Sequence, residues 1–224
     1  MSRKSDTPAE RGEREGLRER VLEASRVLIE QQGLAALSMR EVARRAGVSH
    51  QAPYNHFADR EAILAALAED GFHAIAARFR AVLAATARTD LLGRVKALGR
   101  TYIDFAVAQP AHFRVMFRPE LVDLSRFDAA QAAGDAAFAY LHAAVGELMA
   151  AGLLPGASCD VVAALMWSIV HGFACLALDG PLARSFEVDL ASLTEGVIEQ
   201  LGRLLEAAVP NVRRVSVEEL GGGQ

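Results

Sequence analysis

Five side chains suited to contacts with the base edges of DNA stand close together near residue 50. They are His50, Gln51, Ala52, Tyr54 and Asn55. Gln and Asn can pair with adenine, His can donate or accept, and an Ala methyl or a Tyr ring can pack against a thymine methyl. A helix from about His50 to Phe57 would turn these side chains outward. Pro53 would take its fourth position, where it forfeits only the first intrahelical hydrogen bond.

A helix-turn-helix is the arrangement that would position this segment. Ser38 and Glu41 have the spacing of a capping box, which begins a helix. Gly47 can supply the left-handed conformation that ends this helix, and Ser49 is the expected N-cap of the next one. Four apolar residues would hold the two helices together, namely Val42, Ala46, Val48 and Phe57. The pattern predicts a second helix that is free to enter the major groove.

The run ARRAGVSHQAPYNHFADRE, residues 43–61, is similar to the DNA-binding signature of TetR-family transcriptional regulators. The resemblance spans roughly Leu17 to Leu67. It implies base or groove contacts from Arg40, His50, Gln51, Ala52 and Tyr54, and phosphate contacts from Ser38, Tyr54, His56 and Arg60. Ser49 and Asn55 complete the set of side chains expected at the DNA.

Some of these positions depart from the family pattern or have a plainer interpretation. Lys is the commonest family residue at the Arg60 position, and many members have Leu or Ile at the position of Pro53. His56 also fits a helix-end side chain that caps carbonyls. Ala52 and Asn55 are equally compatible with simple exposure to solvent.

Charge is distributed unevenly along this chain of 224 residues, of which 52% are hydrophobic. Residues 1–60 carry 11 Lys and Arg against 9 Asp and Glu, whereas the remainder carries 13 against 19. A mildly basic N-terminal part on an acidic body places the expected DNA face at the N-terminus. The net charge of −4 argues against non-specific coating of nucleic acid.

Helical periodicity recurs along the whole chain, and no strand pattern or repeat is found. We expect a disordered arm over 1–14, a three-helix DNA-binding domain over 15–57, a helical ligand-binding and dimerisation domain over 58–209, and a disordered tail over 210–224. The helix from Asp59 to Arg88 would be the only link between the two domains. The predicted fold class is therefore all-α.

The uncharged run from Val161 to Leu178 is just long enough to span a membrane, but we interpret it as a helix buried between the core and a partner subunit. Cys159 and Cys175 lie 16 residues apart in this helix, about 24 Å, so they cannot bridge each other. A chain with no signal peptide and no expected disulfide fits the cytoplasm. A cysteine near the start of a helix, as Cys159 is, is more often an inert thiol than a redox sensor.

Trp167, His171 and Gly172 resemble a Trp-x-x-x-His-Gly motif found in one type of TetR-like C-terminal domain. Trp167 and His171 would share a helix face and either touch a ligand or form a core pair, while Gly172 would allow close helix approach. The expected effector is an apolar, aromatic or acyl-bearing small molecule, with Arg114 as an anchor if it is an anion. The candidate lining is Tyr102, Phe105, Phe113, Arg114, Met116, Phe117, Phe138, Met166, Trp167 and His171.

No phosphate loop, nucleophile elbow or close set of metal ligands occurs in the sequence, so we expect neither catalysis nor a cofactor. The favoured function is a homodimeric repressor that leaves a palindromic operator in double-stranded DNA when an effector binds. Its interface would use the last two long helices, with Leu193 and Leu201 at the contact. The alternatives are a DNA-binding regulator without ligand control and a bundle-core metal or cofactor enzyme using His112, His142 and His171.

Overall fold

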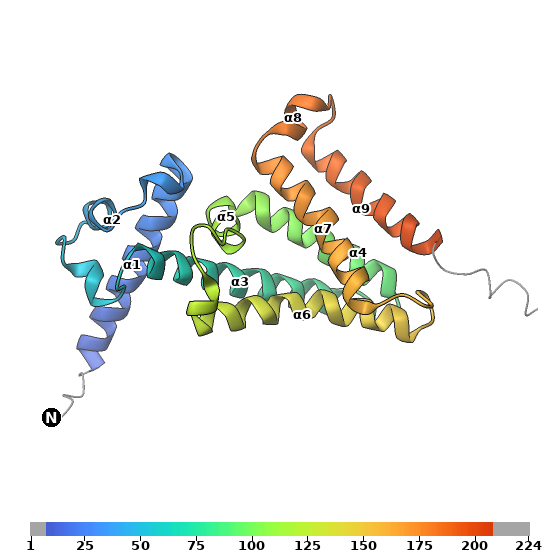
Figure 1. Ribbon diagram of the computed structural model, residues 1–224, viewed down its shortest axis with the longest axis horizontal. Helices are drawn as coiled ribbons and strands as arrows, with labels where there is room; N and C mark the ends of the chain where they lie inside the picture. Colours follow the sequence, from blue (N-terminus) through green and yellow to red (C-terminus); the bar gives the residue numbers. More distant parts are fainter. Residues whose placement is uncertain (1–7, 208–224) are drawn as a thin grey trace, which may run out of the picture. The chain divides into compact units, whose positions relative to one another are not determined.

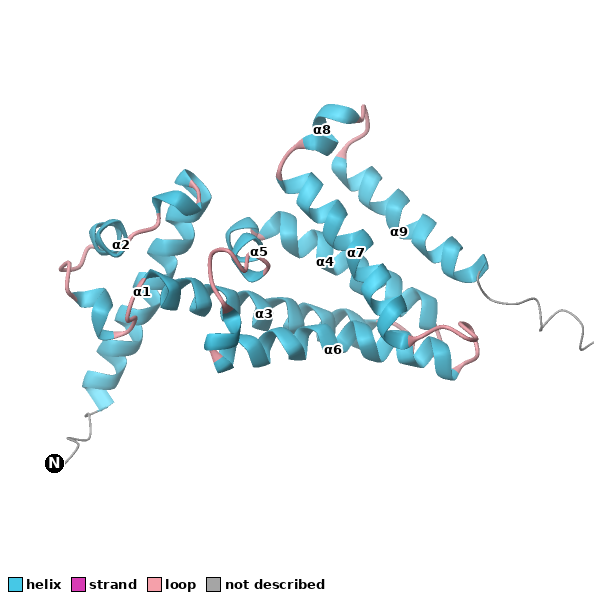
Figure 2. Ribbon diagram, viewed as in Figure 1, coloured by secondary structure: helices cyan, strands magenta, loops and turns pink. Residues whose placement is uncertain are grey.

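The protein is built from helices joined by short turns, as a computed structural model that describes residues 8–207 shows (Figures 1 and 2). In chain order these are α1 (Pro8–Gln32), η1 (Leu34–Ala36), α2 (Met39–Ala46), η2 (Ala52–Asn55), α3 (Arg60–Ala85), α4 (Leu91–Ala108), α5 (Pro110–Met116), η3 (Leu124–Arg126), α6 (Asp128–Ala150), α7 (Cys159–Leu178), α8 (Pro181–Ser185) and α9 (Leu190–Ala207). No strand occurs between residues 8 and 207, which confirms the all-α prediction.

The long helices begin and end close to their predicted limits, with one clear exception. α1 begins at Pro8, whereas we expected disorder over residues 1–14 and a helix only from Leu17. Residues 1–7 and the predicted tail over 210–224 lie outside the described residues. The short helices η1, η3 and α8 were not predicted, because segments of three to five residues are too short to show a period.

The chain forms two compact units whose boundary differs from the predicted one. The first unit comprises the residues up to Ala74 together with Gln109–Asp135, and the second comprises Ile75–Ala108 together with the residues from Ala136 onward. α3 is therefore not the only connection, because the chain also passes between the units after Ala108 and after Asp135. The physical reason is that α5 packs against α1 and so belongs with the N-terminal helices.

In the first unit, α1 is the central element. It packs against α2, η1, η2 and α5 (Figure 1). Val21 and Leu28 of α1, Val42 of α2 and Ile63 of α3 are completely buried. Apolar burial of this kind stabilises a fold by roughly 1.5–3 kcal/mol per side chain, so α1 holds the short helices that follow it.

In the second unit, α4 packs against both α7 and α9. Val95 and Phe105 of α4 are buried, and the methyl of Ile198 lies 3.0 Å from the place that a Cβ on Gly99 would take. Ion pairs border this contact, since Lys96 pairs with Glu199 and Arg100 with Glu195. Gly99 thus allows the close approach of α9.

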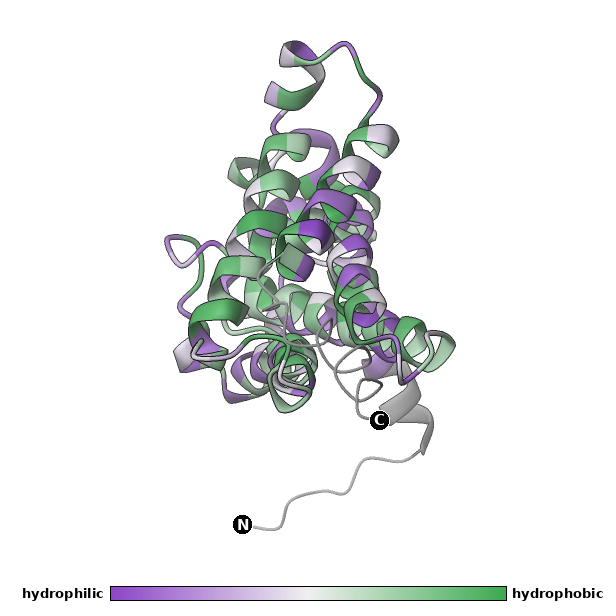
Figure 3. Cartoon of the chain, turned by 90° about the vertical axis from the view of Figure 1, so that its right-hand side faces the viewer, coloured by the Kyte–Doolittle hydropathy of each residue, from purple (hydrophilic) through white to green (hydrophobic). Residues whose placement is uncertain are grey.

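α7 is the one helix within residues 8–207 that is long and apolar enough to cross a membrane, a test that the core helix of a soluble protein also passes. Only 28% of its most apolar stretch is buried within the chain. The expected burial between the core and a partner subunit therefore stays a prediction, and a Cβ on Gly172 would meet nothing within 4 Å. Apolar residues are green in Figure 3 and recur along the helices of the chain. Part of α7 thus presents an apolar surface to solvent.

Candidate nucleic-acid interface and effector site

α2 begins and ends as the sequence predicts. The Ser38 hydroxyl accepts a hydrogen bond from the Glu41 amide at 3.2 Å, which caps the first turn. Gly47 has φ 68° and ψ 34°, and its amide donates to the Ala43 and Arg44 carbonyls. The Ser38 half of the capping box therefore forms. The Glu41 carboxylate instead accepts from Arg44 at 2.9 Å and makes an ion pair with it.

The segment expected to read the DNA bases, residues 50–57, is called the reading segment below. It is not the α-helix that we predicted from His50 to Phe57. It forms a turn followed by the short 3₁₀ helix η2, and the Ser49 side chain does not cap it. Pro53 explains the difference, because it has no amide to donate to the Ser49 carbonyl four residues earlier. That carbonyl instead accepts from the Ala52 amide at 3.0 Å, the i to i+3 pattern of a 3₁₀ helix. Pro53 itself is buried and anchors the segment.

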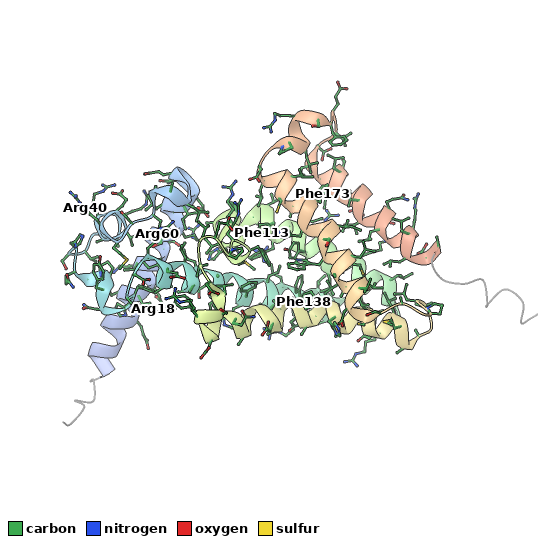
Figure 4. The ribbon with its side chains drawn as sticks, viewed as in Figure 1. Arg18, Arg40, Arg60, Phe113, Phe138 and Phe173 are labelled. Carbon is green, nitrogen blue, oxygen red and sulfur yellow. The ribbon has the colours of Figure 1, made fainter. Side chains whose placement is uncertain are left out.

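The side chains expected at the DNA still lie mostly at the surface of this segment. His50, Gln51 and Asn55 are exposed, Tyr54 is 40% exposed, and Ala52 is half-buried. The His50 and Tyr54 rings lie 6.1 Å apart, so they form one aromatic edge. Ser38, Arg40 and Ser49 are also exposed, whereas His56 and Arg60 are half-buried. Arg40 points away from the helices of the unit in Figure 4.

Arg60 has a structural role that the sequence did not indicate. Its Nε donates to the Leu37 carbonyl at 2.9 Å, and its Nη2 donates to the Leu34 carbonyl at 3.0 Å. These carbonyls belong to η1 and the residue that ends it, so Arg60 ties the start of α3 to the turn before α2. Two of its donors are thus engaged within the protein, which limits what remains for a phosphate.

In the second unit, four of the residues expected to line an effector site form one cluster. Trp167 Nε1 donates to the Tyr102 hydroxyl at 3.2 Å, and that hydroxyl lies 2.8 Å from His171 Nδ1. The Phe138 ring stands edge-on to Trp167 with centroids 5.9 Å apart, and Phe138 is 40% exposed. Cys175, which the sequence did not single out, continues the chain with its Sγ 3.5 Å from His171 Nε2.

The hydrogen bonds link the polar groups of this cluster to one another. The Tyr102 oxygen accepts from the indole and can also donate its own proton to His171 Nδ1, whose role as donor or acceptor depends on the tautomer of the imidazole. Burial raises the pKa of Tyr102 above its usual value and lowers the pKa of His171. Both groups are therefore neutral near pH 7, and the cluster offers an apolar surface with few free polar atoms.

The other predicted lining residues lie elsewhere. Phe105 and Met166 are buried in the second unit, and the Arg78 guanidinium lies 5.3 Å from the Phe105 ring centroid. Phe113, Met116 and Phe117 belong to the first unit, where Phe113 and Phe117 have ring centroids 5.3 Å apart. Arg114 is half-buried on α5. Within residues 8–207, no three His, Cys, Asp or Glu side chains are arranged to hold a metal ion.

Two sequence models of one protein family match the chain. Residues 21–67 match "Bacterial regulatory proteins, tetR family", and residues 95–201 match "Tetracyclin repressor-like, C-terminal domain". The chain belongs to the TetR family of transcriptional regulators. The first match contains α2 and η2, which identifies them as the DNA-binding helix-turn-helix of this regulator. No curated protein matches the sequence.

Solved structures share the fold over most of their length. A protein of unknown function from Rhodococcus sp. RHA1 is 28% identical with a TM-score of 0.73, and the match covers 86% of this chain and 95% of that one. The TetR-family regulator PfmR from Thermus thermophilus is 16% identical with a TM-score of 0.64, covering 84% and 97%. The fatty acid degradation regulator FadR from Bacillus halodurans is 15% identical with a TM-score of 0.66, covering 88% and 96%.

Proposed function

We propose that this TetR-family protein is a homodimeric cytoplasmic repressor that binds a palindromic operator and leaves it when a small hydrophobic effector binds. The observation that carries the proposal is the exposure of His50, Gln51, Tyr54 and Asn55, which lie in η2 and in the turn directly before it. Side chains of these types read base edges in the major groove. Arg40 adds a positive charge at the exposed side of α2.

The exposed side of α7 supports the proposal of a dimer. Val161, Leu165, Ser168, Gly172 and Leu176 follow one another at spacings of three or four residues, so they form a single stripe. Val161 is 65% exposed and Leu165 is 59% exposed, which is unusual for large apolar side chains that lie next to one another. A second copy of α7 would cover this stripe, and Gly172 leaves room for its backbone.

A selection from random DNA duplexes tests the first part of the proposal. A dimer that places two reading segments in successive major grooves should select an inverted repeat with half-sites roughly 34–36 Å apart or a little more. Affinity should fall steeply as salt rises, because phosphate contacts release counterions. Selection of unrelated sequences, or of a single half-site by a protein that stays monomeric, would contradict the proposal.

The cluster around Trp167 is the proposed place of the effector. Its aromatic rings and its neutral, mutually hydrogen-bonded polar groups suit an apolar, aromatic or acyl-bearing molecule better than an ion. Such a molecule must bind better to the form that does not bind DNA, since equal affinity for both forms shifts nothing. Trp167 is the only Trp in the chain, so its fluorescence reports on this cluster alone.

Titration with hydrophobic compounds tests the effector site. A compound that occupies it should change the fluorescence of Trp167 and release the operator over the same concentration range. In a Phe117→Trp, Trp167→Ala double variant the fluorophore moves to the residue directly after α5 and the cluster loses its largest ring, so release should weaken. Equal release from this variant would place the effector elsewhere. If no compound releases the operator, the protein is a DNA-binding regulator without ligand control.

A further inference from the structure

The two cysteines of the chain lie in different chemical surroundings, although both belong to α7. Both are half-buried, so access of solvent does not distinguish them. Cys159 Sγ donates to the backbone carbonyl of His142 at 3.6 Å, whereas Cys175 Sγ lies 3.5 Å from His171 Nε2. Of these two partners, only the imidazole can take up a thiol proton, because a backbone carbonyl does no more than accept a hydrogen bond. Cys175 therefore has a base beside it.

The neighbours of His171 make its imidazole a suitable base. Burial lowers the pKa of His171, so the ring is neutral near pH 7 and able to accept a proton. The Tyr102 hydroxyl lies 2.8 Å from Nδ1. In the tautomer whose Nδ1 carries the hydrogen, this contact orients the ring while Nε2 accepts from Cys175. A sulfur, a base and a group that orients the base are the parts that turn a thiol into a nucleophile.

The surroundings of Cys175 suit an apolar reactant. Trp167, His171 and Cys175 follow one another at intervals of four residues, so they lie on one side of α7. The Trp167 and His171 rings have centroids 5.6 Å apart. Phe138, labelled in Figure 4, stands edge-on to Trp167 and is 40% exposed. A hydrophobic molecule that rests on these rings would thus lie close to a nucleophilic sulfur.

The position of Cys175 also limits which reactions are available to it. Cys159 lies 16 residues earlier in the same helix, about 24 Å away, so the two sulfurs cannot form a disulfide with each other. Addition to the carbon–carbon double bond of an α,β-unsaturated carbonyl compound needs neither a second thiol nor an oxidant. It needs a thiolate and a group that carries the proton, and Cys175 and His171 supply both.

We propose that Cys175 captures hydrophobic α,β-unsaturated carbonyl compounds covalently, with His171 as its base. The Cys175 sulfur forms a C–S bond to the β-carbon while the π bond of the alkene breaks and its electron pair moves to the α-carbon. The thiol proton passes to His171 Nε2 and then to the α-carbon, which leaves a thioether and a neutral imidazole. The inference names a class of ligand for the cluster around Trp167, and in this sense it rests on the proposed function.

The experiment compares oct-1-en-3-one with octan-3-one, a ketone of the same length without the double bond. The full-length protein, free of DNA, is incubated with each compound at pH 7, and peptide mass spectrometry follows addition at each cysteine over time. We expect oct-1-en-3-one to add to Cys175 at least about tenfold faster than to Cys159, and octan-3-one to leave no adduct. Equal rates at the two cysteines, or faster addition to Cys159, would overturn the proposal.

Variants test the role of the imidazole. His171→Gln should slow addition at Cys175 at least about tenfold, because an amide cannot take up the thiol proton. The rate at Cys159 in the same protein should stay the same, which shows that α7 is still folded. Cys159→Ser is the matched control for Cys175→Ser and should leave the rate at Cys175 unchanged. An unaltered rate at Cys175 in the His171→Gln protein would exclude His171 as the base.

Operator binding, measured separately, distinguishes this inference from the proposed function. Oct-1-en-3-one should release the operator from the unmutated protein and from Cys159→Ser, but not from Cys175→Ser. If Cys175 is modified selectively and the operator stays bound, the covalent site is supported and the proposed effector role of the cluster is wrong. If the operator is released equally from Cys175→Ser, capture at Cys175 is not what the regulator detects, and the inference fails while ligand control remains.

Discussion

Gln51 is the exposed side chain of the reading segment best suited to discriminate between bases. Gln51→Ala should change which operator sequences are preferred, by roughly 1–3 kcal/mol at one base pair, while non-specific affinity is kept. The control is Gln32→Ala, the same change at an exposed residue at the end of α1. Binding selection on both proteins measures the effect. A Gln51→Ala protein with an unaltered preference would refute the assignment of the reading segment.

His171 should make the stability of the protein depend on pH. Burial lowers its pKa in the fold below the usual 6.5, so the unfolded chain binds a proton more readily. Its contribution is fully present above about pH 6.5 and is lost as pH falls through the folded pKa. Melting curves between pH 5 and pH 8 should show a weaker fall towards acid for His171→Gln than for the control His73→Gln, whose side chain is 65% exposed. Equal pH dependence in both variants would contradict this.

The exposure of polar side chains at the reading segment could be predicted from the sequence. The contacts that Arg60 and Cys175 make could not. Exposure of Gln51 and Asn55 follows from a local pattern of polar and apolar residues. The acceptors of Arg60 are backbone carbonyls 23 and 26 residues earlier in the chain, and every residue type has such a carbonyl. Cys175 lies one helical turn after His171, so the spacing was visible, but spacing alone does not distinguish a contact from a surface neighbour.

At the scale of elements, Arg60 joins η1 to α3 by two hydrogen bonds from a charged donor. Arg60→Gln should lower the free energy of unfolding by about 2 kcal/mol, because two partly buried carbonyls lose their donor. The control is Arg80→Gln, an exposed arginine further along α3. Urea unfolding measures the stability. Operator binding should weaken for all sequences alike.

The salt dependence of operator binding separates this role from a direct phosphate contact. If Arg60 acts through the fold, the slope of log affinity against log salt stays the same in Arg60→Gln. Loss of a phosphate contact would reduce the slope by about 0.9 per subunit and leave unfolding unchanged. That second pattern would show that the two backbone hydrogen bonds contribute little.

Helix limits were predictable wherever a residue has a local reason to begin or end a helix. Ser38 caps α2, Gly47 ends it, and Asp59 accepts from the Ala62 amide at 2.9 Å to cap α3. The reading segment was mispredicted because the effect of Pro53 was judged on an α-helix alone. A missing amide at the fourth position allows a 3₁₀ helix to form instead of an α-helix. Which of the two helices forms depends on how Pro53 packs, and the local sequence pattern gives no information about this packing.

At the scale of the whole molecule, the structure changes which leucines can form the dimer contact, for which the sequence had suggested Leu193 and Leu201. Leu201 is only 7% exposed in its own unit, so it is part of the core. Our expectation that Leu201 lies at a dimer contact is therefore wrong. Leu165→Glu should give folded monomers that bind operator DNA at least about tenfold more weakly, because a charge interrupts the α7 stripe. Leu201→Glu should instead unfold the second unit.

Light scattering and circular dichroism distinguish these outcomes. The unmutated protein should be a dimer at micromolar concentration, and Leu165→Glu a monomer with unchanged helix content. The Ser168→Ala protein, altered on the same stripe without a charge, should remain dimeric. An unmutated protein that is monomeric at micromolar concentration, or a Leu165→Glu protein that remains dimeric, would exclude α7 as the interface.

The division into units could not be predicted from periodicity. Each helix of the middle segment has an apolar stripe, but the stripe does not specify which neighbour it contacts. α5 packs on α1, more than 75 residues earlier in the chain, and so joins the N-terminal unit. Charge asymmetry placed the DNA face correctly at the N-terminus, since that inference needs only composition.

The exposed stripe of α7 also bears on how much of this protein a cell must make. In the proposed dimer, Val161 and Leu165 of a newly synthesised chain would stay uncovered until that chain meets a second copy. When the chain is scarce, the concentration of pairs rises with the square of the concentration of single chains, by the law of mass action. A twofold change in expression then alters the amount of paired regulator about fourfold. Gene dosage and protein turnover would thus set operator occupancy alongside any small molecule.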